Sequence, residues 1–299
     1  DGPVTVTTFT VAGLAGTFNA GQTATMAGVG TLVINANGTY TFTPVANYNG
    51  PVPVATYNLT DGSSTDSSTL TISVNAVDDA FTDANEVVTV DEDTVLNGTV
   101  LTGTSSVDGP VTVTTFTVAG VAGTFNAGQT ATITGVGTLV INTNGTYSFN
   151  ASNAAYQSLA VGQSTVLTIP YTVTDDKGAT STANLVITVT GTNDAPVAQA
   201  SSFTVAEDAA IVNGSVTSTD VDAGATATYA LNGAAPAGLT FNTNGTYSFN
   251  AGNAAYQSLA VGQSTVLTIP YTVTDDKGAT STANLVITVT GTNDAPVAQ

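Results

Sequence analysis

The 299-residue sequence contains no cysteine, no histidine and no arginine, and these absences exclude several classes of protein. Without cysteine there is neither a disulfide nor any thiol chemistry. Without histidine the commonest general base is also missing. Paired carboxylates could in principle hydrolyse glycosides, but here the acidic residues gather in turns and linkers. We therefore expect no enzyme.

Positive charge is almost absent, because two lysines face 21 acidic residues and the net charge is −19. Contacts with nucleic acid or an anionic membrane surface need Lys and Arg, so neither partner is expected. No apolar run approaches the roughly 18 residues of a membrane span, which predicts no membrane insertion. The chain starts at Asp1 without a signal-like segment, and we expect it to be an excerpt of a longer protein. Such a chain should attract cations.

Two long internal repeats organise the chain. Residues 142–199 recur at 242–299 with one change, Ser152 to Gly252, and residues 1–40 recur at 108–147 with four substitutions. A period near one hundred residues indicates an array of whole domains. We predict three: 1–78, 79–193 and 194–299. The first should lack its N-terminal part, because residues 79–107, which precede the second copy of the Asp-Gly-Pro-Val motif, have no counterpart before Asp1.

Alternating β-branched and aromatic residues predict strands throughout, and only residues 151–160 suggest a short helical turn. The predicted strands are 5–11, 31–34, 39–43, 69–74, 111–118, 138–141, 146–149, 166–174 and 183–189. Three Asn-Gly pairs predict two-residue hairpin turns with positive φ at both positions, at 37–38, 144–145 and 244–245. The predicted fold is all-β, with tandem β-sandwich domains. For the second domain the expected core is Tyr147, Phe149, Leu159, Tyr171, Val173, Leu185 and Ile187, with copies one hundred residues later in the third.

The carboxylates cluster at predicted domain ends, in linkers and in one hairpin turn. Several carboxylates in one place repel each other unless a cation lies among them, and hard oxygen ligands favour Ca²⁺. The alternative is that these are ordinary solvated turn residues. The candidate Ca²⁺ ligands are Asp78, Asp79, Glu92, Asp93, Asp175, Asp176, Asn193, Asp194, Glu207, Asp208, Asp220 and Asp222.

Four motifs together resemble a VCBS repeat of giant bacterial surface proteins. They are Asn-Gly-Thr-Tyr-Ser-Phe-Asn (144–150), Tyr-Gln-Ser-Leu-Ala-Val-Gly-Gln-Ser (156–164), Tyr-Thr-Val-Thr-Asp-Asp-Lys-Gly (171–178) and Gly-Thr-Asn-Asp-Ala-Pro-Val (191–197), and the resemblance covers 142–197 and 242–297. Residues 38–44 and 57–62 are similar to the related cadherin-like tandem repeats. The resemblance implies tandem Ig-like or cadherin-like β-sandwich domains in an elongated array. It further implies that they form the extender region of a type I-secreted RTX adhesin at the bacterial cell surface, stiffened by Ca²⁺. It also implies that Asn193-Asp194 takes the place of the cadherin-type linker motif, and that Glu207, Asp220 and Asp222 correspond to ligands. No Gly-Gly-x-Gly-x-Asp nonapeptide is present, so the RTX secretion region is absent from this sequence.

We therefore expect a structural extender that projects a distal binding domain for attachment and biofilm formation, with neighbouring repeats as its main partners. One alternative is a module that binds glycans or cells through exposed aromatic residues, with Tyr48, Tyr156 and Tyr256 as candidates. The other interpretation of these three tyrosines is that they are core or strand-edge aromatics. Another alternative is the subunit of an extracellular filament, in which a strand from a second chain completes the first domain.

Overall fold

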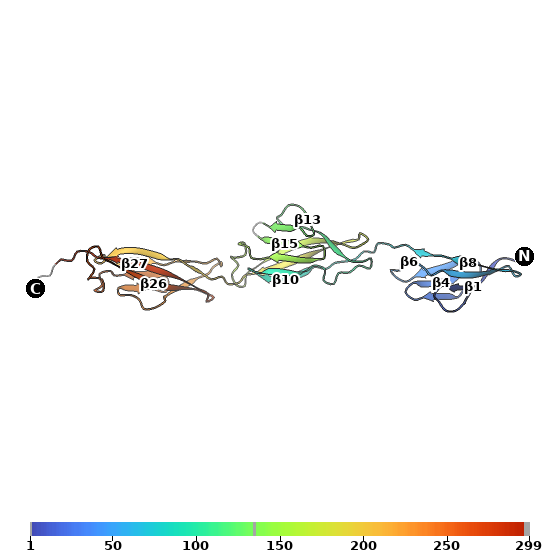
Figure 1. Cartoon of the computed structure of the whole chain (residues 1–299), viewed down its shortest axis with the longest axis horizontal. Helices are drawn as coiled ribbons and strands as arrows, with labels where there is room; N and C mark the ends of the chain where they lie inside the picture. Colours follow the sequence, from blue (N-terminus) through green and yellow to red (C-terminus); the bar gives the residue numbers. More distant parts are fainter. Residues whose placement is uncertain (1, 134–135, 296–299) are drawn as a thin grey trace. The chain divides into compact units, whose positions relative to one another are not determined.

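The computed structural model describes residues 2–133 and 136–295, and the regular structure in these ranges consists of strands (Figure 1). None of the described residues forms a helix, and so none forms one that could cross a membrane. The chain divides into two compact units. One holds the residues up to Thr82 together with Ser105–Val111 and Thr174–Thr180, and the other holds the remainder.

The strands of the first repeat form two main sheets that face each other across an apolar core. The sheet orders are β2-β1-β7-β8 and β3-β4-β5, and the short strands β6 and β9 pair separately. The core side chains include Phe9, Leu32 and Ile34, all almost fully buried. The strands are β1 (Thr5–Val11), β2 (Phe18–Asn19), β3 (Thr23–Met26), β4 (Gly30–Ile34), β5 (Tyr40–Pro44), β6 (Gly50–Pro51), β7 (Ala55–Thr60), β8 (Thr65–Leu70) and β9 (Ser73–Val74).

The second group of strands has one additional strand in each main sheet. The sheet orders are β10-β18-β17-β12-β13 and β11-β16-β15-β14. The strands are β10 (Glu86–Asp91), β11 (Val95–Thr99), β12 (Thr112–Phe116), β13 (Phe125–Asn126), β14 (Thr130–Ile133), β15 (Gly137–Ile141), β16 (Thr146–Asn150), β17 (Ser164–Thr174) and β18 (Thr180–Thr190).

The third group repeats this plan with one strand fewer in each main sheet. Its sheets run β20-β27-β26-β23 and β21-β25-β24, and β19 pairs with β22. The strands are β19 (Val197–Ala198), β20 (Ser201–Ala206), β21 (Val212–Ser215), β22 (Ser218–Thr219), β23 (Ala227–Leu231), β24 (Leu239–Phe241), β25 (Thr246–Phe249), β26 (Ser264–Asp275) and β27 (Thr280–Thr290). The all-β sandwich prediction is thus confirmed. The limits of the predicted domains stay a prediction, and the C-terminal linker copy, 291–297, is described only to Ala295.

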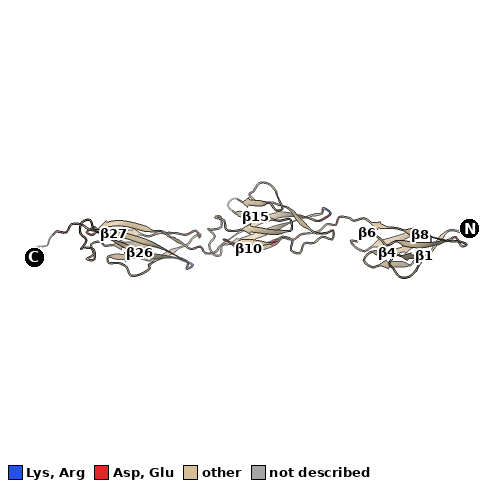
Figure 2. Cartoon of the chain, in the orientation of Figure 1, with Lys and Arg blue, Asp and Glu red and all other residues tan. Residues whose placement is uncertain are grey.

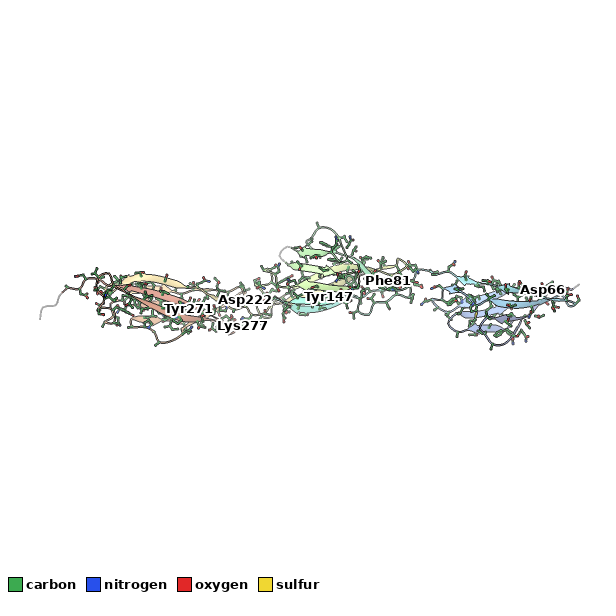
Figure 3. All side chains as sticks on the ribbon, in the orientation of Figure 1. Asp66, Phe81, Tyr147, Asp222, Tyr271 and Lys277 are labelled. Atoms are coloured by element: carbon green, nitrogen blue, oxygen red, sulfur yellow. The ribbon has the colours of Figure 1, made fainter. Side chains whose placement is uncertain are left out.

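Most predicted core residues are buried, because alternate residues of each strand point inward. Tyr147, Phe149, Tyr171, Val173, Leu185 and Ile187 are at most 4% exposed, and their copies in the third sandwich are at most 7% exposed. Tyr147 and Tyr271 lie within the second and third sandwiches in Figure 3. Leu159 and its copy Leu259 are only half-buried, since they lie in a turn-rich connection rather than in a strand.

Three details of local structure differ from the sequence prediction. The Asn-Gly pairs do not form two-residue turns: only the glycine has positive φ, 83° at Gly38, and the Gly38 N–H donates to Asn35 O at 2.9 Å. This is a longer hairpin loop, a type I turn followed by a left-handed glycine, which suits the strand twist equally well. The predicted strand 69–74 is interrupted at residues 71–72, and residues 151–160 form turns without a helix.

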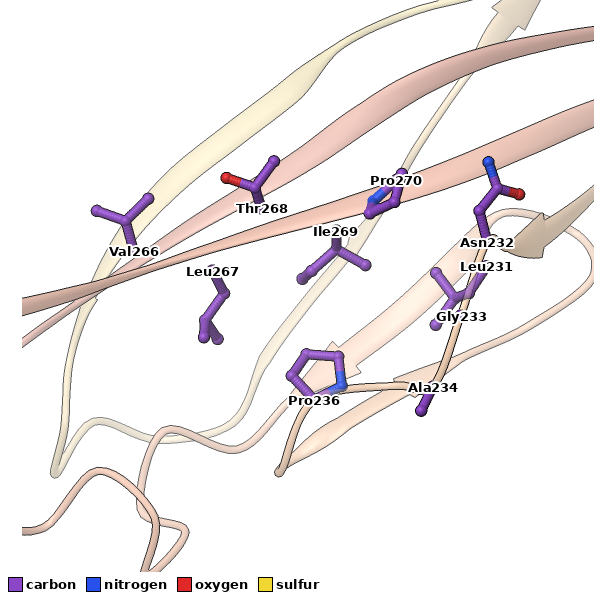
Figure 4. Close-up of a pocket in the computed structure, with 10 residues that line it drawn as sticks. All are labelled: Leu231, Asn232, Gly233, Ala234, Pro236, Val266, Leu267, Thr268, Ile269 and Pro270. Carbon is purple, nitrogen blue, oxygen red and sulfur yellow. The ribbon is translucent and has the colours of Figure 1, made fainter.

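An apolar groove of about 280 Å³ lies beside β26, where β23 has left the sheet (Figure 4). Its lining comes from residues 231–236 and 266–270 and contains no ionisable side chain. The lining therefore offers no ionisable group for general acid–base catalysis.

Candidate metal centre

Three carboxylates from separate segments meet in the second compact unit. Glu92 follows β10, Asp194 follows β18, and Asp222 lies in the loop between β22 and β23. Each offers one oxygen, and these oxygens lie within 4.8 Å of one another. We call these three residues the Glu92 cluster. Asp222 is labelled in Figure 3, and Figure 2 marks the acidic residues along the chain.

Two residues of the Glu92 cluster are buried and Asp194 is half-buried, and hydrogen bonds satisfy only part of the cluster. Glu92 is 1% exposed and Asp222 8%. The Thr192 N–H donates to Glu92 Oε1 at 2.7 Å, and the Asp194 N–H donates to Asp222 Oδ2 at 2.9 Å. Within the described residues, Glu92 Oε2, Asp194 Oδ2 and Asp222 Oδ1 are buried and have no hydrogen-bond partner. Each of the three carboxylates therefore has one free, desolvated oxygen.

Three negative charges at this separation, two of them on buried residues, are costly without a counterion. Two unit charges about 4 Å apart near a protein surface repel by about 4 kcal/mol. Burial is the main cause that raises the pKa of Glu92, and the negative charges of Asp194, Asp93 and Asp222 raise it further. The hydrogen bond from the Thr192 N–H acts in the opposite direction and lowers it. Burial is also the main cause that raises the pKa of Asp194. The negative charges of Asp93, Asp222 and Asp220 add to this effect. In the part of the chain that the structure describes, the one salt bridge joins Lys277 to its neighbour Asp276, outside the cluster.

Three other predicted ligands surround the Glu92 cluster. Asp220 Oδ1 accepts the Asp222 N–H at 3.0 Å and so fixes the loop. Asp93 has a left-handed backbone with φ of 61°, and its Oδ1 accepts a hydrogen bond from Gln157. The Asn193 amide donates to Asp275 Oδ2 at 2.9 Å. These residues lie near the cluster and shape it, but their side chains are not among the three converging carboxylates.

A second cluster lies in the first compact unit. Asp78, Asp108 and Asp175 each offer an oxygen within 4.8 Å of the others, and we call them the Asp175 cluster. Asp175 is buried, but hydrogen bonds satisfy both of its oxygens: Ser106 donates to Oδ2, and the N–H groups of residues 177–179 donate to Oδ1. The Ser106 hydrogen bond, with the three backbone bonds, lowers the pKa of Asp175. This carboxylate is thus stable as an anion without a metal.

The remaining four predicted ligands lie outside both clusters. Asp79 contributes its backbone N–H, which donates to Asp108 Oδ2 at 2.6 Å, and Asp176 is exposed beside Gly109. Asp208 is exposed and accepts a hydrogen bond from Thr292. Glu207 is fully buried, its Oε1 accepts the Thr292 N–H at 2.7 Å, and its Oε2 has no partner among the described residues. Glu207 therefore reproduces the setting of Glu92 in the third sandwich.

Sequence reasoning missed Asp108, which belongs to the Asp175 cluster. Asp108 could have been found, because Ser106-Val-Asp108 follows the pattern of Asp220-Val-Asp222. The structure gives the two segments the same local geometry: the Ser106 hydroxyl accepts the Asp108 N–H, as the Asp220 carboxylate accepts the Asp222 N–H. Asp275 binds the N–H groups of residues 277–279 as Asp175 binds those of 177–179.

The donor set of the Glu92 cluster fits a hard divalent cation. Carboxylate oxygens suit Ca²⁺ and Mg²⁺, whereas zinc and copper sites favour nitrogen or sulfur ligands. Ca²⁺ accepts six to eight oxygens in flexible geometry, which suits three carboxylates from three loops better than the strict octahedron of Mg²⁺.

The tyrosines considered for ligand stacking are not exposed platforms. Tyr156 and Tyr256 are 2% and 5% exposed, and each packs on a phenylalanine of its own core. Burial raises the pKa of Tyr156 to about 12. Tyr48 is half-buried against the first core, and its hydroxyl donates to Pro51 O at 2.5 Å. Tyr156 and Tyr256 are therefore core aromatics, and Tyr48 packs against the first core as a partly buried residue.

Comparisons with known proteins agree with this architecture. Residues 193–291 match the model of the bacterial cadherin-like domain, and residues 7–75 match that of the cadherin-like domain. No curated protein matches the sequence. Among solved structures, the chain is similar to mouse protocadherin-24 EC1-3, with 16% identity, a TM-score of 0.46, and coverage of 96% of this chain and 90% of that one. It is also similar to mouse cadherin-23 EC22-24, with 16% identity, a TM-score of 0.40, and coverage of 97% and 86%. Two parts of the chain, 7–75 and 193–291, are thus similar to cadherin-like domains.

Proposed function

We propose that the chain is a structural extender of a bacterial cell-surface adhesin, and that Ca²⁺ bound at the Glu92 cluster stiffens the junction there. The observation that carries this proposal is the set of three buried carboxylate oxygens without a hydrogen-bond partner among the described residues. A buried unpaired charge costs several kcal/mol, and a divalent cation removes that cost for all three at once.

In this mechanism, Ca²⁺ binding is thermodynamically linked to the ordering of the segment that connects the two sandwiches. Glu92 ends one sandwich, Asp194 lies in the connecting segment, and Asp222 belongs to a loop of the next sandwich. A cation that binds all three fixes the connecting segment and both loops. Because Ca²⁺ binds the ordered arrangement and not the disordered one, it stabilises the ordered state by about 2.7 kcal/mol at a concentration one hundred times its Kd.

The rest of the chain serves as a spacer in this proposal. Near-identical repeats suit a stalk that gains reach by adding modules, and a chain without cysteine suits folding outside the cell, where Ca²⁺ is abundant. The bacterial cadherin-like match supports an extracellular adhesion role. On the VCBS resemblance we further propose type I secretion, placement at the bacterial surface as a rigid rod, and a part in attachment and biofilm formation.

The test is a Ca²⁺ titration of the whole chain, followed by calorimetry and small-angle scattering. We expect saturable binding, a higher melting temperature, and a longer and better defined maximum dimension with Ca²⁺ than with EDTA. A melting temperature and maximum dimension that do not respond to Ca²⁺ would contradict the proposal. The same measurements on the Glu92→Gln variant should show a smaller response to Ca²⁺, which would assign the response to this cluster.

A further inference from the structure

Seven Asn-Gly pairs occur in the sequence, and the structure holds their glycine N–H groups in different ways. The pairs begin at Asn37, Asn49, Asn97, Asn144, Asn213, Asn232 and Asn244. An Asn-Gly pair is prone to deamidation, in which the glycine nitrogen attacks the asparagine side chain, because glycine has no Cβ atom to obstruct the attack. Since all seven pairs share this chemistry, the hydrogen bonds around each pair decide which of them reacts.

Six of the pairs hold the glycine in regular structure. Three donate the glycine N–H back across a hairpin loop at 2.9–3.0 Å, from Gly38, Gly145 and Gly245. In these loops the asparagine Oδ1 also accepts the N–H and the hydroxyl of the threonine two residues later, as Asn244 does from Thr246. Three other pairs place the glycine in a paired strand, at Gly50, Gly98 and Gly214. The nitrogen of each of these glycines is held away from the asparagine side chain.

The seventh pair, Asn232-Gly233, lies in an exposed bend directly after β23 (Figure 4). Among the described residues, no group accepts the Gly233 N–H. No atom beyond the adjoining residues lies within 4 Å of a Cβ built on this glycine. The asparagine itself is anchored: its N–H donates to Pro270 O at 2.9 Å, and its Oδ1 accepts the Thr272 hydroxyl at 2.5 Å. The attacking nitrogen is thus free, while the carbonyl that it attacks is held in place.

We propose that Asn232 is a self-modification site, at which the chain deamidates itself with Gly233 as the nucleophile. Solvent base removes the Gly233 amide proton, and the nitrogen forms a bond to Asn232 Cγ. The bond from Cγ to Nδ2 breaks, and Nδ2 takes up protons from solvent and leaves as ammonia. Water then opens the resulting succinimide. Cleavage of the bond from the nitrogen to Cγ gives aspartate, and cleavage of its bond to the main-chain carbonyl gives isoaspartate.

Thr272 acts on the first step. Negative charge develops on Asn232 Oδ1 as the nitrogen adds, and the Thr272 hydroxyl already donates to that oxygen. A hydrogen-bond donor fixed where charge develops lowers the barrier, because it needs no reorganisation during the reaction. The leaving group is unhindered, since the Asn232 Nδ2 has no hydrogen-bond partner among the described residues.

Both products change the surroundings of the groove beside β26. Each replaces an amide with a carboxylate, which adds one negative charge next to a lining that contains no ionisable side chain. Isoaspartate also lengthens the main chain by one carbon immediately before residues 233–236, which form one wall of the groove. The modification therefore alters both the charge and the shape of this surface.

The test incubates the full chain at pH 8.5 and 37 °C in EDTA, so that the result does not depend on the Ca²⁺ proposal. Peptic digestion and mass spectrometry then follow the conversion of each asparagine, with fragmentation that separates aspartate from isoaspartate. We expect Asn232 to convert at least tenfold faster than Asn244. In concentrated urea the two rates should become similar. Equal rates in the folded chain, or a tenfold difference that persists in urea, overturns the proposal.

A pair of threonine variants tests the role of the hydroxyl. Thr272→Val keeps the β-branched shape and removes the donor, so it should slow conversion of Asn232 several-fold and leave Asn244 unchanged. The matched control is Thr172→Val, which alters the copy of this threonine in the second sandwich and should change neither rate. A Thr272→Val protein that converts Asn232 at the wild-type rate would overturn the assignment of Thr272.

Discussion

At the scale of single residues, the difference between a satisfied and an unsatisfied carboxylate decides where a cation is needed. Asp175 and Asp275 are as buried as Asp222, but each accepts three backbone hydrogen bonds on one oxygen and a side-chain bond on the other. Such bonds favour the charged form, and the pKa of both residues is lowered. Glu92 has one hydrogen bond and one bare oxygen, so its charge depends on a ligand that the protein does not provide.

Glu92→Gln should therefore weaken Ca²⁺ binding at least tenfold, because it removes one of three charges from the site. The matched control is Glu207→Gln, which changes an equally buried glutamate with the same hydrogen bond from a threonine N–H. Isothermal titration calorimetry measures both. Equal losses in the two variants would show that the Glu92 cluster is not the site.

Glu86 gives the second sandwich a pH dependence that the third should lack. Its Oε2 lies 2.5 Å from the Tyr171 hydroxyl, and burial is the main cause that raises its pKa. A raised pKa in the folded state contributes stability below the ordinary value near 4.5, and that contribution is lost as the pH rises through the folded pKa. The corresponding residue in the third sandwich is Ser201.

Replacing Glu86 with glutamine should flatten this dependence and leave the second sandwich at least as stable at pH 7. Hydrogen exchange of β17 and β26, followed between pH 4 and pH 7 in EDTA, separates the two sandwiches. A wild-type second sandwich whose stability does not fall relative to the third over this range would contradict the prediction.

At the scale of elements, glycines govern how closely the loops approach the strands. A Cβ atom at Gly191 would lie 2.1 Å from Leu159 O and 2.5 Å from Ala160 O, and both contacts are with backbone. The next residue, Thr192, donates the hydrogen bond that orients Glu92. The packing of this loop and the geometry of the Glu92 cluster are thus coupled.

Gly191→Ala should destabilise the second sandwich by about 1–3 kcal/mol through overpacking and also weaken Ca²⁺ binding. Gly252→Ser is the control, since serine already occupies the matching position, 152, and the added Cβ would lie 3.2 Å from the nearest atom. Denaturant unfolding with and without Ca²⁺ measures both effects. A stable Gly191→Ala protein with unchanged Ca²⁺ affinity would contradict the coupling.

The partial exposure of Leu70 on β8 should appear in the cost of core truncation. Leu185→Ala removes a fully buried side chain and should cost about 2–5 kcal/mol, whereas Leu70→Ala, at the matching half-buried position, should cost clearly less. Hydrogen exchange in each sandwich gives the two values separately. Equal costs would mean that the Leu70 side chain is as well covered as that of Leu185.

At the scale of the whole molecule, the net charge of −19 and the scarcity of lysine make stability depend on the ionic surroundings. Self-repulsion destabilises a compact chain, and exposed charges are screened by salt while buried ones are screened much less. Ordinary salt should therefore relieve the surface charge but not the Glu92 cluster.

In EDTA, raising NaCl to 0.5 M should recover only part of the stability that millimolar Ca²⁺ supplies. Mg²⁺ at the same concentration should supply less than Ca²⁺, because three carboxylates from three loops do not enforce an octahedral site. Differential scanning calorimetry of the full chain measures all three conditions. Full recovery by NaCl alone would mean that Ca²⁺ acts through general screening.

The strands, the sandwich fold and most core residues could be predicted from the sequence. Apolar and polar residues alternate along each strand, and this alternation arises whenever one face of a strand is buried and the other is exposed. The repeats likewise indicated an array of modules, and the lack of Lys and Arg indicated a cation ligand. The Asn-Gly turns were predicted with the wrong geometry, since the same pair fits two hairpin loops and the strand ends select between them.

Only the tertiary structure decided which carboxylates converge. Glu92, Asp194 and Asp222 are far apart in sequence, and the folding of separate loops brings them together. Asp93 and Asp208 directly follow the buried Glu92 and Glu207 in sequence, yet they are exposed, because they lie in the turns after β10 and β20 and their side chains face solvent there. The sequence alone determined that this protein would gather negative charge at its turns. Whether that charge is neutralised by backbone N–H groups or left for a metal is a matter of burial and hydrogen-bond geometry, which no local pattern encodes.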